Sequence, residues 1–405
     1  MEYTRREFLE SMSAVAALGA VACAPEAQLD DDPLGVRGDF PVVDEMTYLD
    51  SAYITPSPRG AVEAAQSFAA AKARDPVSLG DMLGESNQVR RSFAQLIGAR
   101  EPEIGLLYAT SEGENIVARA LDLGPGDNVV IDDLHYETTF VLYRHLVATR
   151  GIELRIVKST DGVASPAEFA KLVDDRTRLV SVAWVSHQNG YRHDLAALAG
   201  VAHERGAYLY ADAIQGIGML SLDVRAVGID FLTAGTYKWL LGGYGVAPFF
   251  VREELLDTVA LDRMGSLHIS EELGDNHFAL YSDGRKYGYA TPAFGAVFQL
   301  RPALDYLLRV GVPNIERHTV GLAHQLRAGL IEQGYSVWTP PNNGSAIVTF
   351  EHGLDVGRVE AALREANIKV SLKDDGTKIR AGVALFNNKQ DIERLLETTA
   401  GLRRI

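Results

Sequence analysis

A lysine and an aspartate carry the clearest chemistry in this chain. Lys238 lies in the glycine-flanked segment GTYKWLLGG (235–243), and Asp212 begins the segment DAIQ (212–215) at the end of a strand-like stretch. A lysine amine can hold a carbonyl compound as a Schiff base, and a carboxylate can keep a ring nitrogen protonated so that the ring accepts electrons. Together the two residues are the pair that pyridoxal phosphate (PLP) chemistry needs.

The surroundings of Lys238 argue against an ordinary surface lysine. The stretches 208–211 and 231–233 before it and 239–241 after it are apolar. We therefore expect Lys238 to be buried. Burial of an unpaired lysine lowers its pKa and makes the amine a better nucleophile.

Strand-like runs alternate with helical patterns in the first two thirds of the chain. The expected strands are 104–108, 128–131, 153–157, 178–185, 207–211, 231–233 and 247–251, and the expected helices are 114–121, 138–150, 166–173 and 195–205. Such alternation favours an α/β fold with a mostly parallel, seven-stranded sheet and helices on both faces. Ligands bind at the carboxyl ends of such strands, where Ser111, Tyr136, His187, Asp212 and Lys238 are expected.

A smaller α+β domain is expected after the sheet. Its helices are predicted at 296–308, 315–333, 356–365 and 389–400, and its strands at 335–338, 346–350, 369–372 and 378–384. We divide the chain into a signal segment and tether (1–38), a large cofactor-binding domain (39–295) and a small C-terminal domain (296–405).

The composition excludes several classes of protein. Hydrophobic residues make up 47% and charged residues 23% of the 405, and the net charge is −15 with no block of Lys and Arg. Nucleic-acid binding needs clustered cations, so it is not expected. No apolar run is long enough for a spanning helix, and no metal site is expected. Because Cys23 is the single cysteine, the body of the protein has no thiol nucleophile.

The N-terminus resembles a twin-arginine export signal. TRREFL (4–9) precedes a mildly apolar stretch at 12–22, and polar, acidic residues follow to about 38. Cys23 follows Ala-Val-Ala, so either a lipid is attached to Cys23 or the signal is cleaved within 22–27. Because the twin-arginine machinery moves folded proteins, the cofactor can be loaded before export. We expect a periplasmic or otherwise exported enzyme that touches the membrane only through a lipid on Cys23.

Short motifs in order along the chain resemble one family. They are YLDSA (48–52), IR (379–380), FNN (386–388) and DI (391–392). From about residue 46 to the C-terminus the chain resembles the class V aminotransferases, fold-type I PLP enzymes that include the cysteine desulfurases and isopenicillin N epimerase. The resemblance implies the fold-type I architecture and PLP as cofactor.

The segment YATSEGEN (108–115) follows a strand and opens a helix. A helix N-terminus offers unpaired N–H groups and a positive dipole end, which suit an anion. The resemblance places the cofactor phosphate here, chiefly on the backbone of Ser111, Glu112 and Gly113. The alternative is that Ser111 is an ordinary helix N-cap.

The resemblance also implies contacts to the cofactor ring. It puts an aromatic side chain on the ring face, and Tyr136 matches this position better than His135. Such stacking contributes about 1 kcal/mol beyond area burial. For the phenolic oxygen the candidates are His187, which departs from the family pattern, and Gln215, which we prefer.

Four further residues follow from the resemblance. Thr236 is expected to replace a phosphate-binding serine, and Tyr237 to reach the phosphate or the ring. Thr291 is expected to bind the phosphate of the neighbouring subunit, which implies a homodimer with shared active sites. Arg380 is expected to take the substrate carboxylate, because a guanidinium pairs with it in a planar, bidentate way.

Several reactions remain open. The substrate amine displaces Lys238, and the freed lysine can remove the α-proton as a general base. A persulfide mechanism is excluded because the body contains no cysteine. The leading hypothesis is aminotransfer on a small amino acid or on an amino-acid moiety of an exported metabolite. A lyase or epimerase is the second hypothesis, and a non-catalytic binding protein the third; intact Lys238, Asp212 and Arg380 count against the third.

Overall fold

The computed structural model describes residues 31–261 and 263–403. The expected signal segment, Cys23 and residues 24–30 of the tether lie outside the described residues. Among the described residues, no helix is both long enough and apolar enough to cross a membrane.

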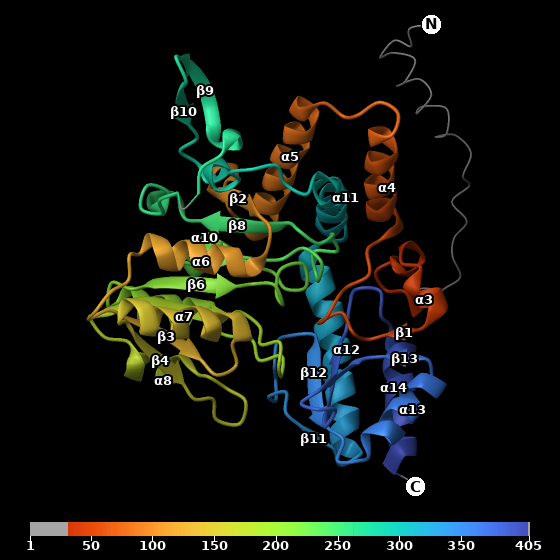
Figure 1. Ribbon diagram of the computed structural model, residues 1–405. Helices are drawn as coiled ribbons and strands as arrows, with labels where there is room; N and C mark the ends of the chain where they lie inside the picture. Colours follow the sequence, from red (N-terminus) through yellow and green to blue (C-terminus); the bar gives the residue numbers. More distant parts are fainter. Residues whose placement is uncertain (1–30, 262, 404–405) are drawn as a thin grey trace, which may run out of the picture.

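A seven-stranded sheet forms the centre of the large domain (Figure 1). Its order is β2 (Ile104–Leu107), β8 (Ala247–Val251), β7 (Phe231–Thr233), β6 (Tyr208–Asp212), β5 (Thr177–Ala183), β3 (Asn128–Asp132) and β4 (Glu153–Val157). These are the seven strands that the sequence predicts, with ends shifted by at most two residues. The predicted fold class is confirmed.

One strand runs against the others. β8 pairs antiparallel with both β7 and β2, whereas the pairs among β3, β4, β5, β6 and β7 are parallel. The loop 234–246, which carries Lys238, joins β7 to β8 without a helix. A parallel neighbour would need a long crossover connection, so this short loop returns the chain in the opposite direction.

Both faces of the sheet are covered. Val129 and Ile131 belong to one core, with α6 (Thr110–Ala120) and α7 (Glu137–Arg150). Val130 belongs to the second core, with α5 (Leu79–Ile97) and α9 (Leu195–His203). Successive strand residues point to opposite faces, which explains the nearly continuous apolar runs of these strands.

The helices before the sheet were not predicted from the sequence. They are α4 (Arg59–Lys72) and α5, which begins at an N-cap where the Ser78 side chain accepts a hydrogen bond from Asp81 N. Both pack on α11 (Phe294–Val310), where the Phe68 and Phe298 rings stack at 4.4 Å. These helices join the N-terminal region to the start of the small domain.

The small domain is built on a four-stranded antiparallel sheet. Its strands are β11 (Ser336–Val337), β12 (Ile347–Glu351), β15 (Lys378–Gly382) and β14 (Ser371–Lys373), and its helices are α12 (Val312–Glu332), α13 (Val356–Glu365) and α14 (Lys389–Arg403). The predicted strand at 369–372 divides into β13 (Ile368–Lys369) and β14. β13 pairs instead with β1 (Thr47–Tyr48), and Arg37 forms an ion pair with Asp391. Arg37 at the end of the expected tether and Thr47–Tyr48, which we assigned to the large domain, therefore contact the small domain.

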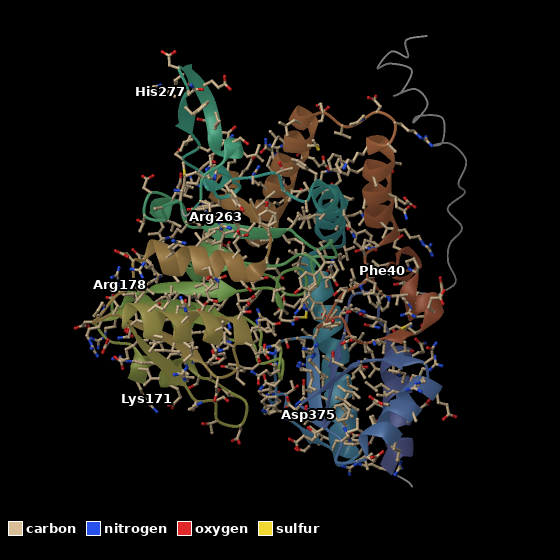
Figure 2. The ribbon with its side chains drawn as sticks, in the orientation of Figure 1. Phe40, Lys171, Arg178, Arg263, His277 and Asp375 are labelled. Carbon is tan, nitrogen blue, oxygen red and sulfur yellow. The ribbon has the colours of Figure 1, made fainter. Side chains whose placement is uncertain are left out.

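A hairpin projects from the large domain. It consists of β9 (Ile269–Gly274) and β10 (His277–Leu280), and its tip is marked by His277 in Figure 2. Leu273, Phe278 and Leu280 are exposed on it. This hairpin was not predicted from the sequence.

Candidate active site

A cavity of about 240 Å³ lies at the carboxyl ends of the central strands. Of the predicted site residues, it brings together Ser111, Tyr136, His187, Asp212, Gln215, Tyr237 and Lys238. The predicted residues that do not line it are Glu112, Gly113, Thr236, Thr291 and Arg380.

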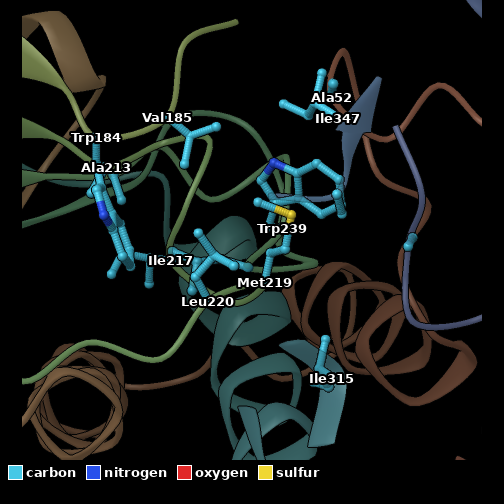
Figure 3. Packing of buried hydrophobic residues seen from close by; sticks show 14 of the residues in the cluster. Ala52, Trp184, Val185, Ala213, Ile217, Met219, Leu220, Trp239, Ile315 and Ile347 are labelled. Atoms are coloured by element: carbon cyan, nitrogen blue, oxygen red, sulfur yellow. The ribbon is translucent and has the colours of Figure 1, made fainter. Parts of the chain in front are cut away.

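Lys238 lies on the tightly held loop between β7 and β8. Its carbonyl accepts a hydrogen bond from Leu241 N at 2.8 Å, and Leu241 adopts a φ of 61°, a conformation that costs a non-glycine residue about 1 kcal/mol or more. The neighbouring Trp239 is buried in the core beside Met219 and Leu220 (Figure 3). The packing of its neighbours therefore fixes the position of the lysine.

The lysine side chain is only partly buried, because it opens on the cavity. Desolvation, helped by the nearby charge of Arg380, lowers the pKa of Lys238 to about 8, while Asp212 opposes the shift. A neutral amine is thus accessible near physiological pH, as the sequence analysis expected.

Asp212 ends β6 in the wall of the cavity. Burial raises its pKa to about 6, against a hydrogen bond from Ile214 N at 3.0 Å and the charge of Lys238, which lower it. No ion pair engages Asp212 among the described residues. A buried carboxylate without a bound cation suits a protonated ring nitrogen.

The start of α6 forms the opposite end of the cavity. Ala109 is the N-cap, and Thr110 and Ser111 begin the helix and line the cavity. The Thr110 hydroxyl accepts a hydrogen bond from Gly235 N at 2.9 Å, which ties the helix start to the Lys238 loop. This helix start can accept an anion.

Glu112 and Gly113 face away from the cavity. The Glu112 N–H is donated to Ala109 O, and its carboxylate accepts from Tyr108 N and pairs with Arg263. A Cβ on Gly113 would lie 2.0 Å from Thr233 Oγ1, so this glycine allows α6 to approach β7 closely. The helix begins at Thr110, with Ala109 rather than Ser111 as its N-cap, so Thr110 and Ser111 line the cavity instead.

Tyr136 and His135 have different positions. Tyr136 is 47% exposed, lines the cavity and meets the His187 ring edge-on at 5.0 Å. His135 is 1% exposed and lies behind it. The geometry favours Tyr136 as the stacking residue.

The two candidates for the phenolic oxygen are ranked differently by the structure. Gln215 donates through Nε2 to Ala52 O at 2.8 Å and accepts from Trp239 Nε1 at 2.9 Å, so its amide is occupied. His187 Nδ1 is buried without a hydrogen-bond partner among the described residues. Burial, followed by the charge of Arg380, lowers the pKa of His187 to about 3, so the ring is neutral. The free nitrogen makes His187 the better candidate, against our preference for Gln215.

Thr236 and Tyr237 also differ in position. The Thr236 hydroxyl donates to the carbonyls of Gly243 and Val246, at 2.6 and 3.0 Å, so it braces the loop rather than facing the cavity. Tyr237 lines the cavity and stacks on Tyr244 at 4.7 Å.

Arg380 lies behind the cavity, at the junction of the two domains. Its guanidinium donates to His187 O at 2.7 Å and to Ser371 Oγ at 3.0 Å, while Nε is buried without a partner among the described residues. Thr291 is exposed, and its carbonyl accepts from the Tyr108 hydroxyl at 3.2 Å. Its side chain does not reach the cavity of its own chain.

Among the cavity-lining residues that were not predicted from the sequence are Thr110, Glu114 and Tyr244. Thr110 is a hydroxyl residue directly before Ser111, which was a usable signal. Glu114 stands one helical turn after Thr110, and only the structure shows that it faces inward. Tyr244 follows two glycines, and no pattern distinguishes it.

The donor set fits PLP. Lys238 can hold its carbonyl group, Asp212 can pair with its ring nitrogen, and the buried, unpartnered His187 Nδ1 can meet its phenolic oxygen. The N–H groups at Thr110 and Ser111 can bind its phosphate. A mostly parallel α/β sheet with these groups at the carboxyl ends of its strands defines a PLP-dependent enzyme.

Comparison with known proteins agrees with this class. The family model "Aminotransferase class-V" matches residues 47–395. A probable cysteine desulfurase of Methanothermobacter thermautotrophicus is 28% identical, over 90% of this chain and 96% of that protein. The chain belongs to the class V aminotransferase family, and PLP is its cofactor.

Solved structures share the fold. The apo cysteine desulfurase of Thermococcus onnurineus NA1 superposes with a TM-score of 0.83 at 25% identity, over 92% of this chain and 98% of that one. A mutant of C-DES with glycine covalently linked to its PLP cofactor superposes with a TM-score of 0.83 at 20% identity, over 90% of this chain and 98% of that one.

The raised pKa of Asp212 predicts a conflict between stability and function. Since the folded pKa, about 6, exceeds the ordinary value of 3.8, ionisation above pH 6 costs the apoprotein on the order of 3 kcal/mol. Asp212→Asn removes this cost, so the apo variant should be more stable than wild type at pH 8, by a margin that shrinks toward pH 5. Turnover with PLP should fall about 100-fold. Denaturant unfolding at both pH values and a kinetic assay measure the two effects.

Asp230→Asn is the matched control. Asp230 is also buried, but it accepts from Leu209 N and pairs with His203 and Arg252. Its replacement should destabilise the protein at pH 8. A loss of stability in Asp212→Asn at pH 8 would contradict the assignment.

Proposed function

We propose that this protein is a PLP-dependent aminotransferase that acts on the α-carbon of an amino acid or an amino-acid moiety. The carrying observation is one cavity that holds a lysine of lowered pKa and a buried, unpaired aspartate. When bound, PLP supplies an electron-accepting ring that stabilises negative charge at the α-carbon. Lys238 binds the cofactor, and its amine, once released, takes the α-proton and returns it.

The relatives named as cysteine desulfurases suggest another reaction, which this chain cannot perform through a thiol of its own body. The only cysteine is Cys23, within the N-terminal segment that resembles an export signal. We therefore favour a reaction that needs no protein thiol. We keep Arg380 as the partner of the substrate carboxylate; because its guanidinium donates to His187 O and Ser371 Oγ behind the cavity, a substrate has to displace one of these contacts to pair with it.

The absorbance of the bound cofactor tests this proposal. Titration of the purified holoenzyme with single amino acids should convert the visible band to that of the amine form stoichiometrically, and a keto acid should restore it. Lys238→Ala should show neither change, and borohydride reduction should leave cofactor mass on the wild-type chain alone. Spontaneous recovery of the band with pyruvate, ammonia or inverted substrate would replace the aminotransferase by a lyase or epimerase.

We also propose a homodimer with shared active sites. The support is that Thr291 is exposed and outside its own cavity, and that the nearby hairpin exposes Leu273, Phe278 and Leu280. Lys238→Ala and Thr291→Ala should each lower activity. Because a mixed dimer regains one intact site, a refolded equal mixture should reach about a quarter of wild-type activity. A mixture no more active than Thr291→Ala alone, or a monomer by light scattering, would overturn this proposal.

We propose further that the enzyme is exported by the twin-arginine machinery. The support is the segment at 4–9 with Arg5 and Arg6. Replacing both arginines by lysine should retain the protein in the cytosol with its cofactor band intact, as cell fractionation measures. Cys23→Ser should shift exported protein from membrane to soluble periplasm if Cys23 carries a lipid. Equal export of the double-lysine variant would contradict the proposal.

A further inference from the structure

Glu114 is a buried acid in the cavity wall that has no part in the chemistry above. It is 4% exposed and projects from α6. Its Oε1 accepts a hydrogen bond from Ser181 Oγ at 2.5 Å, and its Oε2 accepts one from Thr139 Oγ1 at 2.7 Å. Since Ser181 lies on β5 and Thr139 in the first turn of α7, the carboxylate joins three elements.

The hydrogen bonds around Ser181 have a fixed direction. Tyr136 N–H donates to His135 Nδ1 at 2.8 Å, so this nitrogen is an acceptor. Burial lowers the pKa of His135 to about 4, so the ring is neutral and carries its proton on Nε2. His135 Nε2 can then donate to Ser181 Oγ, 3.3 Å away, which leaves the serine proton for Glu114. The chain runs from the backbone of Tyr136 to Glu114 without a conflict.

Tyr136 is positioned by its backbone, which these hydrogen bonds hold. It is the N-cap of α7, yet its side chain makes no capping hydrogen bond, and it is 47% exposed. Its ring makes an edge-on contact with the His187 ring, and its hydroxyl makes no hydrogen bond that would fix it further among the described residues. The backbone of Tyr136 is held at two points: its N–H donates to His135 Nδ1, and its carbonyl accepts from Thr139 N. His135 is linked to Glu114 through Ser181, and Thr139 donates to Glu114 directly.

We propose that Glu114 is a positioning residue that, through Ser181, His135 and Thr139, holds Tyr136 in place to stack on PLP. This inference rests on the proposed function, because it takes Tyr136 as the ring-stacking residue. Glu114 itself does not need to touch the cofactor.

Protonation of Glu114 leaves its hydrogen bonds to Ser181 and Thr139 possible. Burial raises its pKa to about 7; the hydroxyls of Ser181 and Thr139 oppose this shift, and Asp212 adds to it. A protonated carboxyl keeps an acceptor for Ser181 and can donate to Thr139 Oγ1. A glutamine offers the same acceptor and donor, whereas a leucine of similar size offers neither.

Three variants test the proposal by equilibrium binding of PLP to the apoprotein and by the visible circular dichroism of the bound cofactor. Glu114→Leu and Ser181→Ala should each weaken PLP binding about 10-fold and reduce the dichroism. Glu114→Gln should restore both to within about 3-fold of wild type. Because both residues act in one chain, the double variant should lose no more than Glu114→Leu alone.

Glu103→Gln is the matched control for a general loss of stability. Glu103 is 1% exposed, and accepts from Arg100 N and Glu253 N and pairs with Arg225, away from the cavity. It should lower the denaturation midpoint and leave PLP binding unchanged. If Glu114→Leu does not fold, Ser181→Ala and Glu114→Gln decide the matter.

Two results would overturn the inference: wild-type PLP affinity and dichroism in Ser181→Ala, or a Glu114→Gln variant as impaired as Glu114→Leu. Failure of the wild-type protein to bind PLP would instead refute the proposed function. The two failures are therefore distinguishable.

Discussion

Desolvation of two opposite charges is the interaction on which this site depends. Burial lowers the pKa of Lys238 and raises that of Asp212, because the charged form of each group is less stable here than in water. Neither has an ion-pair partner within 4 Å among the described residues. A ligand that presents a carbonyl to one and a protonated ring nitrogen to the other removes both penalties. Relief of these two desolvation penalties therefore favours binding of the cofactor.

The large sheet makes this arrangement possible. Asp212 ends a central parallel strand, and Lys238 stands on the loop that turns β7 into the antiparallel β8. A loop of this kind is exposed to distortion, yet buried Trp239 and the Thr236 hydroxyl bonds hold it from both sides. Asp212 ends β6 and Lys238 follows its neighbour β7, so adjacent strands of one sheet position the two groups.

The sequence predicted the sheet well because its strands are short and all but the edge strand β4 are apolar and largely buried, so their composition indicates them. It also predicted Lys238 and Asp212, whose residue types are tied to the chemistry. It failed where hydrogen bonds decide between neighbours. Gln215 looked free, but Ala52 and Trp239 occupy its amide from distant parts of the chain. Ser111 and Glu112 are adjacent, and which of them faces the cavity depends on where α6 begins. The helix begins at Thr110, which places Ser111 in the cavity wall and turns Glu112 away. The hairpin strands are short and most of their residues are exposed, so no long apolar run marks them in the sequence.

Glu114 and Asp212 show how one fold assigns different roles to two buried acids. Desolvation is the largest influence on both, and it raises both pKa values. The difference lies in what already satisfies them. Two hydroxyls from separate elements occupy the oxygens of Glu114, so a ligand has little to add there. Asp212 has one backbone N–H and the more distant charge of Lys238, so its unmet demand is for a cation. Glu114, whose oxygens already accept hydrogen bonds from the protein, can position other residues, whereas Asp212 can bind a cationic group of the ligand.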